Sequence, residues 1–283
     1  MQTMRIAGHS CSTPHLGPLE AIDFYGKIGL DGIELSCDQN YRCAITHQAS
    51  PALRKELRSR AQAAGIEFAC LAPFLRDFNV PDPLRRASTI ETMRRYVDLA
   101  HELVCPSIRV FAGREVEESE RREHLGYLAE SLRKAGEAAE QAGVHLLIEN
   151  HECTMGLSAR QTVEIIEITD HPAIGIIYDQ GMLTYHNCEP FADAIQAQAK
   201  WIRHVHVKDF ILSLNRRRVA TVVGKGQLPW HQIVPALHRH GYGGFLSLEY
   251  ETRWFPYVGE IPPPEIGLVE GARYIRELLS GLA

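Results

Sequence analysis

Four apolar segments of the chain each carry, near their carboxyl ends, a residue that could bind a metal ion or move a proton. The segments are VHLLIENH at 144–151, AIGIIYD at 173–179, IRHVHVKD at 202–209 and FLSLEYE at 245–251, and the residues are Glu149, Asp179, His206 and Glu249. Three carboxylates and an imidazole at one end of a sheet repel one another unless a cation binds among them. The pattern therefore predicts a divalent-metal site. Three oxygens and one nitrogen favour Mn²⁺, with Mg²⁺, Co²⁺ and Zn²⁺ as alternatives.

A structural role competes with this interpretation at every position. A carboxylate at a strand end can cap the following helix or pair with an arginine, and for any one of the four residues alone that reading is the stronger. Chance is a weaker explanation for four apolar segments that all end in this way. Four unrelated acids or imidazoles would have to coincide.

The side-chain period of a strand extends the site by two residues. With a period of two, His204, His206 and Lys208 share one face, and His151 shares a face with Glu149. We expect Lys208 and His151 to bind substrate, whereas His204 reads as a hydrogen-bonded core histidine. Solvent exposure is the competing reading for Lys208. It is also the stronger reading for Asp209 and for the arginines at 216–218, and the cysteines read as core residues.

Strand-like and helix-like segments alternate along the whole chain. The strand-like segments are 4–10, 31–36, 66–73, 107–113, 144–151, 173–179, 202–209 and 245–251, and the helix-like ones are 20–29, 50–65, 85–104, 122–143, 158–169, 190–200, 228–241 and 265–282. Eight such units in 283 residues predict a single α/β domain, 1–283, folded as a (β/α)₈ TIM barrel. A doubly wound sheet is the alternative, but no Gly-x-Gly-x-x-Gly turn follows the first strand. In a barrel, residues at the carboxyl ends of strands form the active site.

Composition points to a small-molecule enzyme. The chain has 45% hydrophobic and 23% charged residues and a formal charge of −5, so nothing indicates a nucleic-acid or membrane partner. Seven scattered cysteines without a Cys-x-x-Cys pair favour reduced thiols. We find neither a leader peptide nor a spanning segment, and we expect a cytoplasmic protein.

Several short motifs at the strand ends resemble the sugar phosphate isomerase/epimerase family of the xylose isomerase-like TIM barrel superfamily. They are DGIEL at 31–35, RVFAG at 109–113, LLIEN at 146–150, YDQG at 178–181, HVHVKD at 204–209, GKGQLPW at 224–230 and LSLEYE at 246–251. The resemblance implies a metal held by Glu149, Asp179, His206 and Glu249. It also implies that Glu149 and Glu249 exchange a proton at carbon through a metal-stabilised enediolate, and that the protein is a homo-oligomer.

The resemblance leaves the reaction open. Ketose 3-epimerases carry a histidine three residues after the strand-six aspartate, where this chain has Met182, and His186 is a candidate substitute. The His-x-Lys-Asp sequence after His206 is more typical of dehydratases and other isomerases. We therefore predict an isomerase or epimerase of a ketose, keto-inositol or sugar phosphate.

Three other functions compete with it. A lyase acting on a keto-polyol or 3-keto-glycoside is the first alternative, and a non-catalytic sugar-binding subunit is the second. A DNA-repair phosphodiesterase fits poorly, because it would need more metal-binding histidines and a basic groove. The segment 253–267 could cover the barrel mouth or form a contact surface.

Overall fold

Eight parallel strands close into a barrel in the computed structural model, which describes residues 3–213, 217–251 and 261–282. The strands are β1 (Arg5–His9), β2 (Gly32–Ser36), β3 (Glu67–Ala72), β4 (Ser107–Val110), β5 (His145–Glu149), β6 (Ile174–Asp179), β7 (Ile202–Val207) and β10 (Phe245–Leu248). They follow one another round the barrel in chain order, and β10 closes it against β1. The predicted (β/α)₈ barrel is confirmed, and the doubly wound alternative is wrong.

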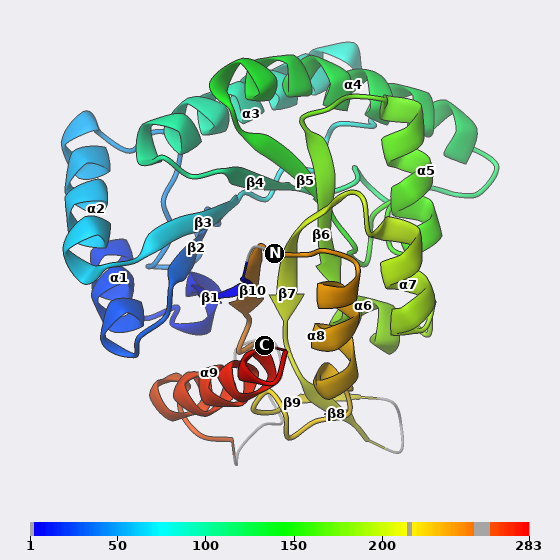
Figure 1. The fold of residues 1–283 in the computed structure, drawn as a ribbon. Helices are drawn as coiled ribbons and strands as arrows, with labels where there is room; N and C mark the ends of the chain where they lie inside the picture. The colour runs from blue at the N-terminus through cyan, green and yellow to red at the C-terminus, as the bar shows by residue number, and fades with distance from the viewer. Residues whose placement is uncertain (1–2, 214–216, 252–260, 283) are drawn as a thin grey trace.

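Helices surround the strands (Figure 1). They are α1 (Pro18–Lys27), α2 (Pro51–Ala64), α3 (Pro83–Leu103), α4 (Arg121–Ala142), α5 (Ala159–Thr169), α6 (Gln180–Tyr185), α7 (Phe191–Gln198), α8 (Trp230–Arg239) and α9 (Pro264–Ser280). Apolar side chains of the outer strand faces pack against them and form the main core. Because every strand runs the same way, all carboxyl ends meet at one end of the barrel.

Local sequence sets the helix ends. At the start of α2, the Ser50 hydroxyl accepts a hydrogen bond from the Leu53 amide, and Pro51 occupies the first turn. The same helix ends at Gly65, whose φ of 69° lies in the left-handed region that glycine adopts without strain. The sequence showed these helix-capping residues, and all eight predicted helices are present.

Three features of the described residues were not expected. The 3₁₀ helix η1 (Ser10–Ser12) follows β1, the short helix α6 follows β6 directly, and an antiparallel hairpin of β8 (Phe210–Leu212) and β9 (Arg218–Ala220) follows β7. Several strands are also shorter than predicted. In particular, β7 ends at Val207 and β10 at Leu248, so Asp209 and Glu249 lie just beyond their strands.

The expectations for the cysteines, for the segment 253–267 and for a membrane-spanning helix have different outcomes. Four of the seven cysteines are buried, whereas Cys11 and Cys188 are half-buried and Cys153 is exposed, which corrects the core assignment for these three. Residues 253–260 of the segment 253–267, and Arg216, lie outside the described part of the chain. Within that part, no helix combines the length and the apolar character needed to cross a membrane.

Asp209 holds the turn that leads from β7 into the hairpin. Its carboxylate accepts four backbone N–H bonds of 3.0–3.1 Å, which come from Phe210, Gly224, Gly226 and Leu228. The side chain is 4% exposed, so the reading of Asp209 as a solvated strand end is wrong. Gly226 lies so close that any side chain at that position would collide with the carboxylate. Asp209 thus fixes the backbone between the strand that carries His206 and the loop beyond it.

Replacing Asp209 by alanine is expected to lower the free energy of unfolding by about 2–6 kcal/mol. The buried amides of Phe210 and Leu228 would lose their acceptor, and each unsatisfied buried donor costs about 1–3 kcal/mol. Urea unfolding followed by circular dichroism measures the difference. The exposed Asp98 of α3 offers a control, because Asp98→Ala should change the stability by no more than about 0.5 kcal/mol. A wild-type urea midpoint for Asp209→Ala would contradict the assignment.

Candidate metal centre

The four residues predicted to bind a metal lie together at the carboxyl end of the barrel. Glu149 and Asp179 end β5 and β6, His206 is the penultimate residue of β7, and Glu249 directly follows β10. From His206 Nδ1, the distances are 2.8 Å to Glu149 Oε1, 3.5 Å to Glu249 Oε1 and 3.8 Å to Asp179 Oδ2. All four side chains are buried.

The donor atoms fit a divalent cation. Glu149, His206 and Glu249 offer ligand atoms that lie within 4.8 Å of one another. Asp179 falls outside this mutual set. Its Oδ1 accepts the Met182 amide at 3.0 Å and caps α6. Its Oδ2, Glu149 Oε2 and Glu249 Oε2 are buried, and their charged partners are Lys208 for Asp179 and Glu249 and Arg109 for Glu149. Buried carboxylate oxygens clustered in this way are the ligand type that an oxygen-binding cation such as Mn²⁺ or Mg²⁺ takes.

The charges of the buried groups agree with this fit. Four carboxylates, Glu34, Glu149, Asp179 and Glu249, face two permanent cations, Arg109 and Lys208. Four minus two leaves two negative charges, which one divalent cation would balance. Without a cation, a protonated His206 would offset one of these two charges. Burial by itself would lower the pKa of His206, but the carboxylates of Glu249, Glu34 and Glu149 raise it well above its usual range.

Lys208 lies inside the site and is not a surface lysine. It is 3% exposed, and its Nζ lies 2.8 Å from Asp179 Oδ2 and also pairs with Glu249. Burial would lower the pKa of Lys208, but Asp179 and Glu249 raise it well above its usual value, so the group stays an ammonium. Gly181 allows this placement, because a Cβ there would lie 2.6 Å from Lys208 Cγ.

Arg109 is a site residue that the sequence analysis missed. It lies on β4, is 4% exposed, and its guanidinium lies 3.3 Å from Glu149 Oε2. Phe74 and Phe111 flank it, each with the ring centroid 4.4 Å from the guanidinium carbon. Burial would raise the pKa of Glu149, but Arg109 and His206 hold it below its usual range. An arginine inside the apolar segment SIRVFAG was the available signal.

A cavity of about 330 Å³ opens onto these residues. Its polar lining includes Glu149, His151, Lys208, Arg109, Arg218 and Glu249, and its apolar lining includes Tyr41, Phe74 and Met182. This volume is at the lower end of the range of about 300–1,000 Å³ found for ligand pockets. A lining that combines charged groups with aromatic side chains suits a small polyhydroxylated molecule.

His186 contacts Glu152 and does not line the cavity. Its Nε2 lies 2.8 Å from Glu152 Oε2, and His186 is absent from the cavity lining, whereas Met182 is present. His186 therefore does not take the place of the histidine that ketose 3-epimerases carry at the position of Met182. Arg218 of β9 lines the cavity instead and lies 3.4 Å from Glu152 Oε1. The reading of the arginines at 216–218 as a solvated loop holds for the exposed Arg217 and is wrong for Arg218.

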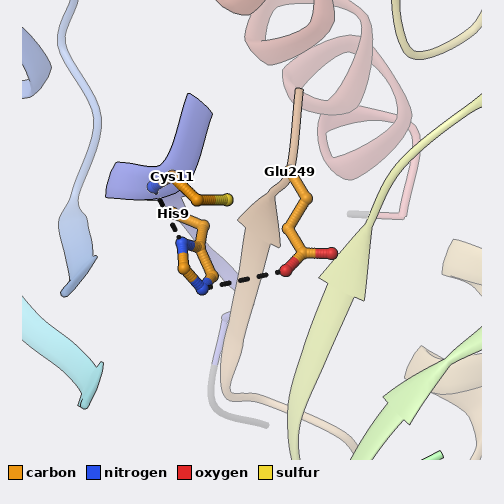
Figure 2. Close-up of side chains that lie close together, drawn as sticks. All are labelled: His9, Cys11 and Glu249. Carbon is orange, nitrogen blue, oxygen red and sulfur yellow. Dashed lines mark hydrogen bonds and ion pairs between the residues drawn. The ribbon is translucent and has the colours of Figure 1, made fainter. Parts of the chain in front are cut away.

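His9 of β1 lies near Glu249 on the side of β10 opposite to β7 and His206. Its Nδ1 accepts the Cys11 amide at 3.1 Å, and its Nε2 points toward Glu249 Oε1 at 3.8 Å (Figure 2). The proton of a neutral His9 therefore lies on Nε2. The thiol of Cys11 is a weak candidate ligand, because burial and the charge of Glu249 raise its pKa well above the usual value.

Comparison with known families identifies the fold. The family model described as xylose isomerase-like TIM barrel matches residues 22–278. The chain belongs to the xylose isomerase-like TIM barrel family. The resemblance read from the strand-end motifs is thereby confirmed.

Relatives within the xylose isomerase-like family carry out more than one reaction. The chain is 26% identical to an inosose dehydratase of Clostridium perfringens over 138 residues, which cover 44% of this chain and 46% of that protein. It thus spans about half the length of the curated relatives that it matches. The solved L-ribulose 3-epimerase superposes with a TM-score of 0.82 at 20% identity, covering 99% of this chain and 95% of that one.

A probable 3-DHS dehydratase from Bacillus anthracis superposes with a TM-score of 0.76 at 20% identity, covering 96% of this chain and 99% of that one. Identities this low show the shared barrel alone. The substrate must be argued from the site.

Proposed function

We propose that this chain is a divalent-metal-dependent isomerase or epimerase that moves a proton on a carbon beside the carbonyl of a ketose, keto-inositol or sugar phosphate. Glu149, Asp179, His206 and Glu249 would hold the cation, with Mn²⁺ favoured and Mg²⁺, Co²⁺ or Zn²⁺ as alternatives. The observation that carries the proposal is the pair of buried carboxylates, Glu149 and Glu249, which both line the same cavity.

The two glutamates would share the proton transfer. Glu149, held by Arg109 and His206, would take the proton from carbon, and Glu249, held by Lys208, would return it. The roles would reverse for the opposite epimer. A bound divalent cation would supply positive charge that stabilises the negative charge developing on the substrate oxygens.

Other pocket residues would bind and orient the sugar. Lys208 and His151 line the cavity and carry N–H groups suited to hydroxyl or carbonyl oxygens. The aromatic ring of Phe74 would cover an apolar face of the substrate. We propose further that the protein is cytoplasmic and that its working form is a homo-oligomer. Light scattering of the purified protein tests the oligomeric state.

A lyase is the second candidate. The match to inosose dehydratases and the His-x-Lys-Asp sequence at 206–209 favour it. Both reactions begin with removal of the same carbon-bound proton. The lyase then expels a neighbouring group, either a hydroxyl as water or the glycosidic oxygen of a 3-keto-glycoside as an alcohol, and the second carboxyl group would supply the proton that this leaving group takes.

Proton exchange in D₂O separates the candidates. The Mn²⁺-loaded protein would be incubated with ketoses, inososes and 3-keto-glycosides and followed by NMR. Deuterium in recovered substrate and its epimer supports the first proposal. Loss of water, or of the alcohol from a 3-keto-glycoside, with formation of a new double bond identifies a lyase. A protein that binds Mn²⁺ but exchanges no proton of any of these compounds would overturn both and favour a sugar-binding subunit.

A further inference from the structure

Glu34 of β2 lies directly behind the candidate metal centre. Its side chain is fully buried and contributes nothing to the cavity lining, so it cannot touch a substrate there. The neighbouring donors face it from β1, β7 and β10. The contacts to Oε2 are Ser247 Oγ at 2.7 Å and His204 Nε2 at 2.8 Å, and those to Oε1 are His206 Nε2 at 3.2 Å and His9 Nε2 at 3.8 Å.

These contacts determine which nitrogen of His206 is available. An ionised carboxylate only accepts hydrogen bonds, so His206 donates its Nε2–H to Glu34. The other nitrogen, Nδ1, points at Glu149, Asp179 and Glu249, at 2.8–3.8 Å. Without a cation Nδ1 also donates, to Glu149. A cation held by those three carboxylates would take the place of the Nδ1 proton, and the remaining proton would stay on Nε2, where Glu34 accepts it.

We propose that Glu34 is a positioning residue that selects the Nε2–H tautomer of His206 and so makes Nδ1 the nitrogen that binds the cation. The inference rests on the metal site of the proposed function. A carboxylate behind a metal-binding histidine fixes the ring and increases its basicity, and its loss typically weakens metal binding by about 10–100-fold.

A purely structural role would give a different pattern of effects. If Glu34 served only to satisfy His204 and Ser247, removing either partner should resemble removing the acid. If Glu34 acts through His206, only changes that disturb their shared hydrogen bond should alter metal binding. Ser247→Ala is therefore the matched control, because it removes a donor to Oε2 and leaves the contact between Oε1 and His206 in place.

The test compares Glu34→Gln, Ser247→Ala and the wild-type protein by calorimetric titration with Mn²⁺. Glutamine is close to isosteric, but its NH₂ group must face one set of donors, so it cannot accept from both His204 and His206. We expect affinity for Mn²⁺ to fall by about 10–100-fold in Glu34→Gln and to stay essentially unchanged in Ser247→Ala. Equal effects of the two substitutions, or wild-type affinity in a folded Glu34→Gln variant, would overturn the proposal.

NMR of the wild-type protein provides a second test that does not require the variant to fold. In ¹⁵N-histidine-labelled protein loaded with diamagnetic Zn²⁺, His206 should carry its proton on Nε2 and bind zinc through Nδ1. Zinc bound through Nε2, or a proton on Nδ1, would overturn the proposal. A protein that shows the expected His206 signature yet moves no carbon-bound proton would refute only the proposed enzyme function.

Discussion

Glu149→Gln is expected to lower kcat by about 10²–10⁴-fold, the range typical of a lost general acid or base. Glutamine keeps the size of the side chain but cannot take up a proton. The buried environment, with Arg109 at 3.3 Å and His206 at 2.8 Å, holds the wild-type residue ionised and ready to accept one. Turnover and solvent-deuterium exchange should both fall, and circular dichroism should show an unchanged fold.

Glu249→Gln should have a comparable effect, because the second carboxylate returns the proton. Glu251 provides the control, since it lines the same cavity two residues further on but lies outside the proposed acid–base pair. Glu251→Gln should retain most of the turnover. Near-wild-type rates in either Glu149→Gln or Glu249→Gln would remove that residue from the catalytic pair. If each variant loses exchange from only one epimer, the two glutamates act on opposite faces of the substrate.

His206→Ala is expected to remove most of the affinity for the cation. The imidazole is the only nitrogen among the four proposed ligands and lies between the carboxylates of Glu149 and Glu249. The loss should exceed the roughly 10–100-fold that removing a partner behind a ligand costs. Metal content after dialysis and calorimetric titration with Mn²⁺ measure it directly.

Thermal unfolding offers an independent readout for the same variant. Free Mn²⁺ at 100 times its dissociation constant should stabilise the wild-type protein by about 2.7 kcal/mol, and this gain should disappear in His206→Ala. His151→Ala is the control, because His151 lines the cavity but is not one of the proposed metal ligands. Wild-type metal content and an unchanged thermal response in His206→Ala would exclude His206 from the site.

The sequence by itself determined the barrel and the cluster of four residues at its carboxyl end. Apolar segments of strand length alternate with helices whose ends are marked by capping residues. That alternation specifies a parallel sheet in which the carboxyl ends of the strands lie together. A period of two then placed Lys208 on the face of His206, and its contact with Asp179 agrees with that placement. These conclusions required only local periodicity and chain order.

Only the tertiary structure decided what surrounds the cluster. Arg109, Glu34 and His9 are polar residues within or at the end of apolar strands. Their presence there is a local signal, but it does not show which side chains on other strands they contact. Asp209 looked like an exposed strand end because its four donors come partly from a loop up to nineteen residues away. Contacts between residues that are distant in the chain depend on how the barrel closes, and one sequence read in order does not contain that distance information.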